Sequence, residues 1–96
     1  MSAELQTVVA SVREGYLLHY DPTRTRQEPD QDLALLTGDQ CYATGLLELA
    51  EQGDLHNIGV LARLIAGGAQ AHAGGDIESA EALWKPFLND LKPSAS

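Results

Sequence analysis

Apolar residues recur every three or four positions over most of the chain, which is the spacing of one face of an α-helix. The first such repeat predicts a helix over about residues 3–20, with polar residues on the opposite face. Its apolar face holds Leu5, Val8, Val9, Val12, Tyr16 and His19 or Tyr20. The polar stretch DPTRTRQEPD follows, and its prolines predict a loop.

A second helix is predicted to begin at Asp30 or Asp32, either of which could cap the first turn, and to end at Gln52. The residues expected on its inner face are Leu35, Asp39, Tyr42, Leu46, Leu49 and Ala50. Gly53 and Asp54 form a stop and start signal, because glycine adopts the left-handed conformation that ends a helix and aspartate caps the next one. The third helix is therefore expected over about residues 55–73.

Gly75 and Asp76 repeat this signal before a fourth helix. The apolar stripe of that helix holds Ile77, Ala80, Trp84, Phe87, Leu88 and Leu91. Pro86 lies inside it and predicts a kink near Ala82 or a last segment that restarts as a short turn. Together these elements predict one all-α domain over residues 1–92, a small bundle of four main helices in antiparallel hairpins, followed by a disordered tail at 93–96.

The third helix is apolar around most of its circumference, so we expect other elements to cover several of its faces. Glycine inside a helix costs up to about 1 kcal/mol relative to alanine, and the close approach of another backbone would offset that cost. The glycines concerned are Gly45, Gly59, Gly67 and Gly68. The alternative is that Gly67 and Gly68 break the helix. A helix-pairing site, within one chain or between two, is expected at Tyr42, Leu46, Leu49, Val60, Leu64, Gly67 and Gly68.

Asp39 would face the core on a long second helix, where an unpaired carboxylate is costly. One interpretation pairs it with a histidine or with Arg63, giving a shifted pKa or a metal ligand. The other, which we favour, is a hydrogen-bonded structural aspartate or a helix that starts at Gly38. Metal-ligand spacing such as HxxxH is absent from His19, His56 and His72, so no metal site is predicted. Cys41 is interpreted as a small buried hydrophobe.

Charge narrows the classes of partner. The 96 residues hold 6 Lys and Arg against 14 Asp and Glu, a formal net charge of −8, and no basic stripe that could neutralise phosphates. Nucleic acid and anionic membranes are therefore poor candidates. The most apolar window, residues 58–73, is interrupted by polar residues and predicts no membrane span. The start MSAELQTVVA lacks a signal-peptide pattern and the single cysteine excludes an internal disulfide, so a cytoplasmic location is the default.

The stretch GDQCYATGLLELAEQGD, residues 38–54, preceded by LALL, resembles the central region of the trans-type polyprenyl diphosphate synthases. In that family an aliphatic run leads into Gly-Asp and then into alanine, leucine, alanine, glutamate and a helix-ending glycine, at the positions of Ala43, Leu49, Ala50, Glu51 and Gly53. The similarity extends weakly through Ala73. It implies that Asp39 is an internal structural residue and that its helix contributes to a subunit interface.

The same comparison argues against prenyl-transfer activity, because the catalytic motifs of the family are missing. Those synthases hold magnesium and an allylic diphosphate with two DDxxD-type motifs, whereas the place of the first motif here reads LLHYDPTRTR, with Asp21 alone. We expect the second motif to lie in a half of the enzyme that this chain does not contain. One aspartate with Arg24 and Arg26 cannot organise a metal cluster. The resemblance therefore implies a non-enzymatic helical subunit without a cofactor, either an accessory or regulatory subunit of a prenyl synthase complex or a homodimer.

Two other function classes compete with this one. The segment GGDIESAEALWKPFLNDLKP is similar to one helix of a tetratricopeptide repeat, although no equivalent segment recurs at that family's period of about 34 residues. It would make the chain a peptide- or protein-binding adaptor with an open groove lined by Trp84 and Phe87. A small-molecule sensor or minimal metal enzyme would need one or more of the three histidines to converge with Asp39.

Overall fold

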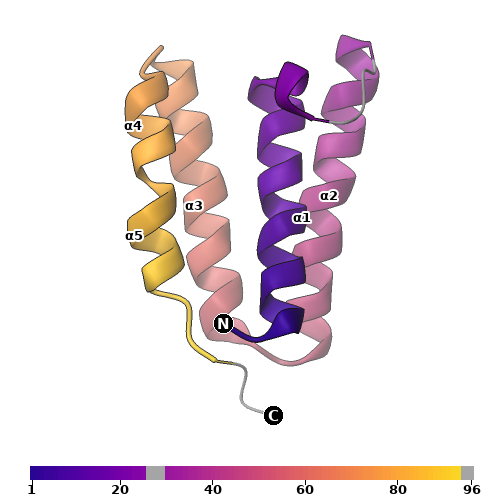
Figure 1. Cartoon of the computed structure of the whole chain (residues 1–96), viewed down its shortest axis with the longest axis vertical. Helices are drawn as coiled ribbons and strands as arrows, with labels where there is room; N and C mark the ends of the chain where they lie inside the picture. The colour runs from indigo at the N-terminus through magenta and orange to yellow at the C-terminus, as the bar shows by residue number, and fades with distance from the viewer. Residues whose placement is uncertain (26–29, 94–96) are drawn as a thin grey trace.

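The computed structural model describes residues 1–25 and 30–93, and within them the chain is an all-α bundle of four main helices in two antiparallel hairpins (Figure 1). The predicted fold class is confirmed. The long helices are α1 (Ala3–Tyr20), α2 (Gln31–Glu51) and α3 (Leu55–Ala73); a short 3-10 helix, η1 (Pro22–Arg24), follows α1, and the fourth position is shared by α4 (Ile77–Ala82) and α5 (Trp84–Asn89). The tail predicted to be disordered lies outside the described residues except for Pro93.

Side-chain caps begin the long helices and α4; those at Asp30, Asp54 and Asp76 were predicted from the sequence, and Ser2 at the start of α1 was not. Asp54 Oδ1 accepts a hydrogen bond from the amide of Asn57 (3.2 Å), which satisfies one of the free donors of the first turn. Ser2, Asp30 and Asp76 accept in the same way from Leu5, Leu33 and Ser79. Gly53 and Gly75 have φ of +70° and +75°, the left-handed conformation that lets the chain leave one helix and enter the next.

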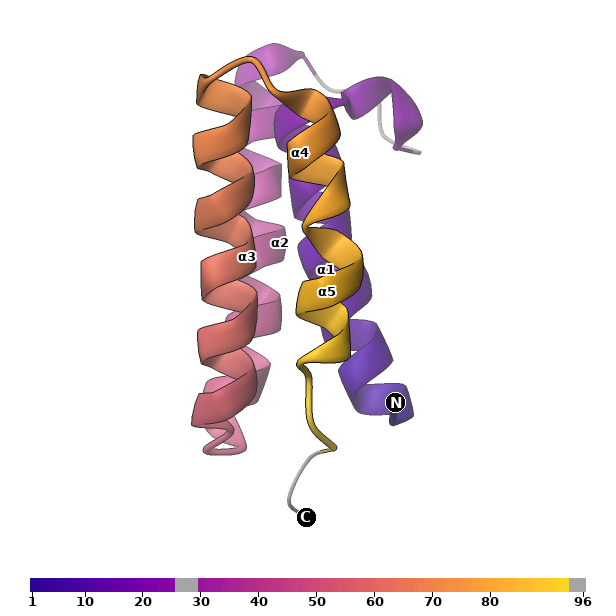
Figure 2. The same cartoon turned by 90° about the vertical axis from the view of Figure 1, so that its left-hand side faces the viewer.

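The fourth helix is interrupted at Leu83, which ends α4 and precedes α5. Pro86 has no amide hydrogen, so it cannot donate to the carbonyl four residues earlier and the helical hydrogen bonds are interrupted there. The two short helices run end to end beside α3 (Figure 2). Of the two predicted alternatives, the structure shows the restart, and the restarted segment is a short α-helix instead of a turn.

The most extensive helix pair is α1 with α2, and their backbones nearly touch. A Cβ placed on Gly15 would lie 2.8 Å from the carbonyl oxygen of Gly38, and one on Gly45 would lie 3.2 Å from that of Val8. Ser11 Oγ donates to the carbonyl oxygen of Cys41 at 2.8 Å, across the same contact. The expected backbone approach therefore occurs at Gly45, and Gly15 and Gly38 extend it.

This contact corrects the predicted inner face of α2. Leu35 is 42% exposed, and Asp39 and Ala50 are exposed as well, so these three expectations are wrong. The residues of α2 that are buried are Ala34, Gly38, Gly45 and Leu49, while Tyr42 and Leu46 are half-buried. The reason is steric: only the smallest residues fit where two backbones meet, so α2 turns its glycines inward and several leucines outward.

The hydrophobic core lies between α1, α3 and α5, with one leucine from α2. Its buried members are Leu5, Val8, Val12, Tyr16, Leu49, Leu61, Leu64 and Trp84. The third helix is not broken at Gly67 or Gly68, because α3 continues to Ala73. A Cβ on Gly68 would lie 3.5 Å from the Tyr16 ring and one on Gly67 would lie 3.1 Å from Leu83, so side chains and not a second backbone occupy this space. None of the helices in residues 1–25 and 30–93 combines the length and hydropathy that a membrane crossing requires.

We predict that Gly15→Ala lowers the free energy of unfolding by about 1–3 kcal/mol, the usual cost of adding a methyl group to a well-packed contact. The new Cβ would lie 2.8 Å from a backbone oxygen, which cannot rotate away. The control is Gly59→Ala, whose Cβ would meet only the flexible Arg63 guanidinium at 3.2 Å and should raise stability by up to about 1 kcal/mol. Urea denaturation measures the stability of both variants. An unchanged unfolding midpoint for Gly15→Ala would show that the backbone contact at Gly15 is not as close as the structure indicates.

Candidate functional site

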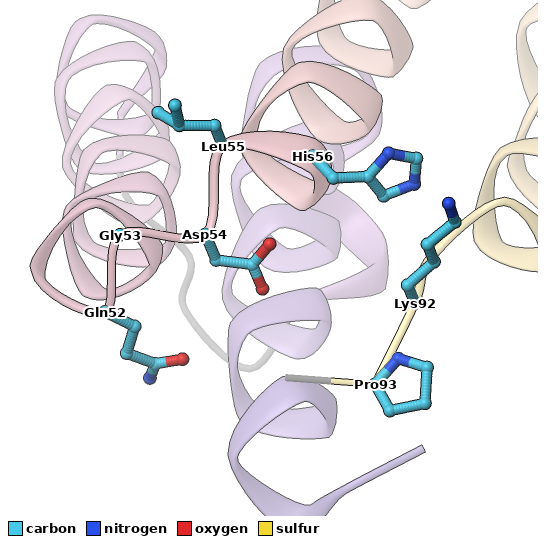
Figure 3. A pocket seen from close by; sticks show the side chains of 7 residues that line it. All are labelled: Gln52, Gly53, Asp54, Leu55, His56, Lys92 and Pro93. Atoms are coloured by element: carbon cyan, nitrogen blue, oxygen red, sulfur yellow. The ribbon is translucent and has the colours of Figure 1, made fainter. Parts of the chain in front are cut away.

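Three polar clusters and one exposed face could carry function. The first cluster borders a hollow of about 240 Å³ at the turn between α2 and α3 (Figure 3). The hollow is lined by Gln52, Gly53, Asp54, Leu55, His56, Lys92 and Pro93. The turn supplies one wall and the segment after α5 supplies the other, so this hollow depends on how that segment is held.

Asn57 holds the segment in place. It is wholly buried, and its Nδ2 donates to Asp54 Oδ2 and to the carbonyl oxygen of Lys92, both at 2.8 Å. Its Oδ1 accepts from the amide of Lys92 at 2.9 Å, so both ends of the side chain amide are bonded. His56 Nε2 lies 2.9 Å from the carbonyl oxygen of Asp90, which requires the proton on that nitrogen. The cluster is a clamp that ties the end of the chain to the start of α3.

We predict that Asn57→Ala lowers stability by about 1–3 kcal/mol, because it removes the three side-chain hydrogen bonds of a wholly buried amide and leaves the backbone groups of Lys92 without this partner. Hydrogen exchange at the Lys92 amide should speed up more than exchange in the middle of α3. The matched control is Asn89→Ala, at an exposed position of α5. It should change stability by less than about 0.5 kcal/mol and leave hydrogen exchange at the Lys92 amide as in wild type. Equal protection of the Lys92 amide in Asn57→Ala and wild type would contradict the clamp.

The second cluster joins α1 to α3 and α5 through aromatic rings. Tyr16 Oη lies 2.7 Å from His72 Nε2, and the Tyr20 ring stacks on the His72 ring with centroids 3.9 Å apart and planes at 1°. The Trp84 ring meets Tyr16 nearly edge-on, at 5.3 Å and 71°. Aromatic pairs in these arrangements are favourable beyond the area they bury.

Charged groups cover this aromatic cluster. Arg13 lies 4.8 Å above the Trp84 ring and its Nη2 donates to both carboxylate oxygens of Glu81, at 3.3 and 3.2 Å. Arg24 reaches the same carboxylate at 3.5 Å. A hollow of about 310 Å³ lies here, lined by Tyr16, Tyr20, Asp21, Arg24, His72, Ile77 and Glu81. The polar groups that line the hollow pair with one another, as Arg24 does with Glu81 and Tyr16 with His72, so the arrangement joins helices together. We call this cluster the aromatic bracket.

The third cluster contains Asp39. Its Oδ1 lies 2.9 Å from His19 Nε2, and the His19 ring packs against Tyr42 with centroids 5.1 Å apart. The partner is thus a histidine and not Arg63. However, the Asp39 side chain is 68% exposed, so the expectation of a buried structural aspartate is wrong. The glycine contact with α1 rotates α2 so that Asp39 lies at the edge of the pair, and a polar contact this exposed adds little stability.

One of the three histidines, His19, reaches Asp39. His72 packs against the Tyr20 ring, as His19 does, but its Nε2 contacts Tyr16, whereas His56 contacts the carbonyl oxygen of Asp90 at the other end of the bundle. Over residues 1–25 and 30–93, no three His, Cys, Asp or Glu side chains gather in a way that could hold a metal ion. Burial, followed by the charge of Glu14, raises the pKa of the half-buried Cys41 thiol, which disfavours the reactive thiolate.

Burial also raises the pKa of Tyr42 well above its usual 10.0, and the nearby Tyr20, Tyr16 and Asp39 add to the shift. The folded protein therefore keeps this phenol neutral where the unfolded chain ionises. Ionisation of Tyr42 therefore leaves the free energy of unfolding unchanged well below pH 10.0 and lowers it as the pH rises past that value, because the unfolded state then binds fewer protons than the folded state.

We predict that Tyr42→Phe reduces the loss of stability between about pH 8 and about pH 11 by about 1.4 kcal/mol, the cost of holding one tyrosine neutral one unit above its unfolded pKa. Urea unfolding of wild type and variant at the two pH values gives the difference, in which Cys41 and the other tyrosines cancel. If both proteins lose the same stability, Tyr42 titrates normally and its burial is not what the structure indicates.

The exposed face is the outer side of α2. Of the seven large apolar residues that are exposed in the described parts of the chain, four lie on this helix. Leu33, Leu36 and Leu47 are 50%, 63% and 59% exposed and lie on the side away from α1. We name as the outer stripe the residues at spacings of three and four along this side: Leu33, Leu36, Gln40, Ala43, Leu47 and Ala50. All six are exposed, and Figure 1 shows α2 at the edge of the bundle, away from α4 and α5.

Sequence reasoning assigned Leu33, Leu36 and Leu47 to neither face of α2, and it placed Ala50 of the outer stripe on the inner face. The signal was available in the glycines: Gly38 and Gly45 are seven residues apart and mark the side that faces α1. Of the residues expected at a helix-pairing site, Leu49, Val60, Leu64 and Gly68 are buried within the chain, whereas Tyr42, Leu46 and Gly67 are half-buried. Pairing between two chains through them stays a prediction.

A scan of protein-family models and searches of characterised proteins and of solved structures found no match for this chain.

Proposed function

We propose that this chain is a non-catalytic, cytoplasmic helical protein that acts by binding another protein through the outer stripe of α2. The observation that carries the proposal is the exposure of Leu33, Leu36 and Leu47 in one row on a helix that packs against α1 on its opposite side. Contiguous apolar rows on a surface are characteristic of interaction sites, whereas single exposed leucines are not. The spacing of three and four matches a helix-on-helix contact.

A non-catalytic role is supported by how the polar side chains are used. Tyr16, His72, Arg24 and Glu81 pair with one another or with neighbouring helices in the aromatic bracket. Asn57 bonds to backbone groups of the clamp. A general acid, base or nucleophile needs access to a substrate, and these groups are occupied in holding helices together.

The class of partner is suggested by the resemblance of residues 38–54 to the polyprenyl diphosphate synthases. The helix at this position contributes to a subunit interface in that family, and residues 38–54 lie on α2 and the turn after it. The chain would then be an accessory or regulatory subunit of a catalytic prenyl synthase. This part of the proposal rests on the resemblance alone.

The adaptor interpretation receives no support from the structure. It requires an open groove at Trp84 and Phe87, but Trp84 is only 8% exposed and is covered by Arg13 and Tyr16. Phe87 is half-buried and packs against the core of the bundle. The chain's own helices fill the place where a peptide would have to bind.

The test compares partners captured by tagged wild type and by the double variant Leu36→Gln/Leu47→Gln. Glutamine preserves charge and helix propensity, so stability should change by less than about 0.5 kcal/mol at each exposed site. Quantitative mass spectrometry of pull-downs from native lysate should show an identified protein, a prenyl synthase on the narrower proposal, depleted at least about tenfold in the variant.

The control variant is Ile77→Gln, which removes a side chain that is 62% exposed at the start of α4, away from the outer stripe. It should capture the same proteins as wild type. If the double variant recovers every partner that wild type recovers, the outer stripe is not the binding surface and the proposed function is wrong.

A further inference from the structure

We propose that the segment that binds the outer stripe is a basic amphipathic α-helix, with apolar residues facing α2 and Lys or Arg at the edge positions that lie beside Asp32, Asp39 and Glu51. This inference rests on the proposed function and adds the chemistry of the partner. It follows from three properties of α2: the repeat of the outer stripe, the side on which its glycines lie, and the sign of the charges beside it.

The outer stripe has the geometry of a coiled-coil seam. With Leu33, Gln40 and Leu47 at the first position of a seven-residue repeat, Leu36, Ala43 and Ala50 fall at the fourth, and these two positions face a partner helix in a coiled coil. The glycines that contact α1 occupy the sixth position of the same repeat, on the far side of α2. One helix therefore presents two opposite packing surfaces, of which the chain itself covers only one.

The length of the outer stripe sets the length of the partner. Residues 33–50 rise by about 25 Å along the helix axis at about 1.5 Å per residue. A partner helix of about five turns would cover that distance. Ala43 and Ala50 allow it to approach closely, and Gln40 places one polar group in the middle of the seam, where a single polar residue fixes register.

The charges beside the outer stripe are all acidic. Asp32 and Glu51 flank it near its two ends, Asp39 flanks its middle, and Glu48 is half-buried on the same helix. No Lys or Arg occurs anywhere in α2, and the whole chain has a formal net charge of −8. Flanking charges determine which helices pair in coiled coils, so these acids select Lys or Arg on the partner.

A second copy of this chain fits the shape but not the charge. Antiparallel pairing about the middle of the outer stripe would place Leu33 level with Ala50 of the other copy and Leu36 level with its Leu47. It would also bring together two acidic helices that contain no base, each on a chain of charge −8. Like charges at a seam oppose association, which leaves a basic helix as the favoured occupant.

The experiment uses two synthetic helical peptides of the length given above, with identical leucines at the seam and either Lys or Glu at every flanking position. Isothermal titration into the full chain should show binding of the Lys peptide at least about tenfold tighter than that of the Glu peptide, with the difference shrinking as salt is raised. A third peptide with the same lysines and serine in place of the leucines should not bind. Leu36→Gln/Leu47→Gln should abolish binding of the Lys peptide, whereas Ile77→Gln should preserve it.

Charge reversal in the protein gives the converse test. Asp32→Lys/Glu51→Lys should weaken binding of the Lys peptide and strengthen binding of the Glu peptide. A loss of folding would not strengthen binding of either peptide. Tight binding of the Lys peptide that survives Leu36→Gln/Leu47→Gln would overturn the inference, because the peptide would then bind elsewhere.

Two further outcomes separate the inference from the proposed function. If neither leucine peptide binds while light scattering shows a wild-type dimer that Leu36→Gln/Leu47→Gln converts to a monomer, the basic partner is wrong and the stripe is an interface between two copies. If neither peptide binds and wild type is monomeric, the basic helix is again wrong. In that result the pull-down alone decides whether the outer stripe binds a protein.

Discussion

The contact between the backbones of α1 and α2 at Gly15 and Gly38 is the constraint on which the rest of the bundle depends. A Cβ added at Gly15 would lie 2.8 Å from the carbonyl oxygen of Gly38, so only glycine fits at this position. Helices that approach this closely gain dispersion contacts along their length and offset the cost of glycine in a helix. The hydrogen bond from Ser11 to the carbonyl oxygen of Cys41 adds a polar contact at the same place. The rotation of α2 about its own axis is fixed as a result.

The remainder of the core has to be supplied by other helices, since α2 contributes mainly small residues. Large side chains come from α1, α3 and α5 and include Tyr16 and Trp84. Gly68 gives the Tyr16 ring its space on α3, which brings Tyr16 Oη within 2.7 Å of His72. The ion pairs of Glu81 then hold α4 to α1 and η1. Aromatic and charged residues that resemble a binding site in isolation thus serve to join the two hairpins.

The boundaries of the helices could be predicted from the sequence because their causes are local. An aspartate caps the amides of the next turn, a glycine accepts positive φ and a proline removes a donor, whatever the rest of the chain does. The rotation of α2 could not be predicted in this way. Its hydrophobic pattern favoured Leu35 and Asp39 on the inner face, whereas Gly38 and Gly45 mark the side that faces α1, and this signal acquires its meaning only once the backbone of α1 lies against them. Asp39 and the outer stripe were assigned incorrectly or missed for the same reason.

Magnitudes indicate what kind of association the outer stripe can support. Full burial of an exposed leucine is worth about 1.5–3 kcal/mol. Leu33, Leu36 and Leu47 are only 50%, 63% and 59% exposed, so burying the rest of them is worth about 3–5 kcal/mol in total. Association costs about 4–15 kcal/mol in lost translational and rotational freedom. These leucines alone therefore do not offset that cost, and apolar residues and charges supplied by the partner have to contribute the rest. Since every charge on α2 is acidic, we expect the same row of leucines to favour a helix that supplies the missing bases over a second copy of this chain.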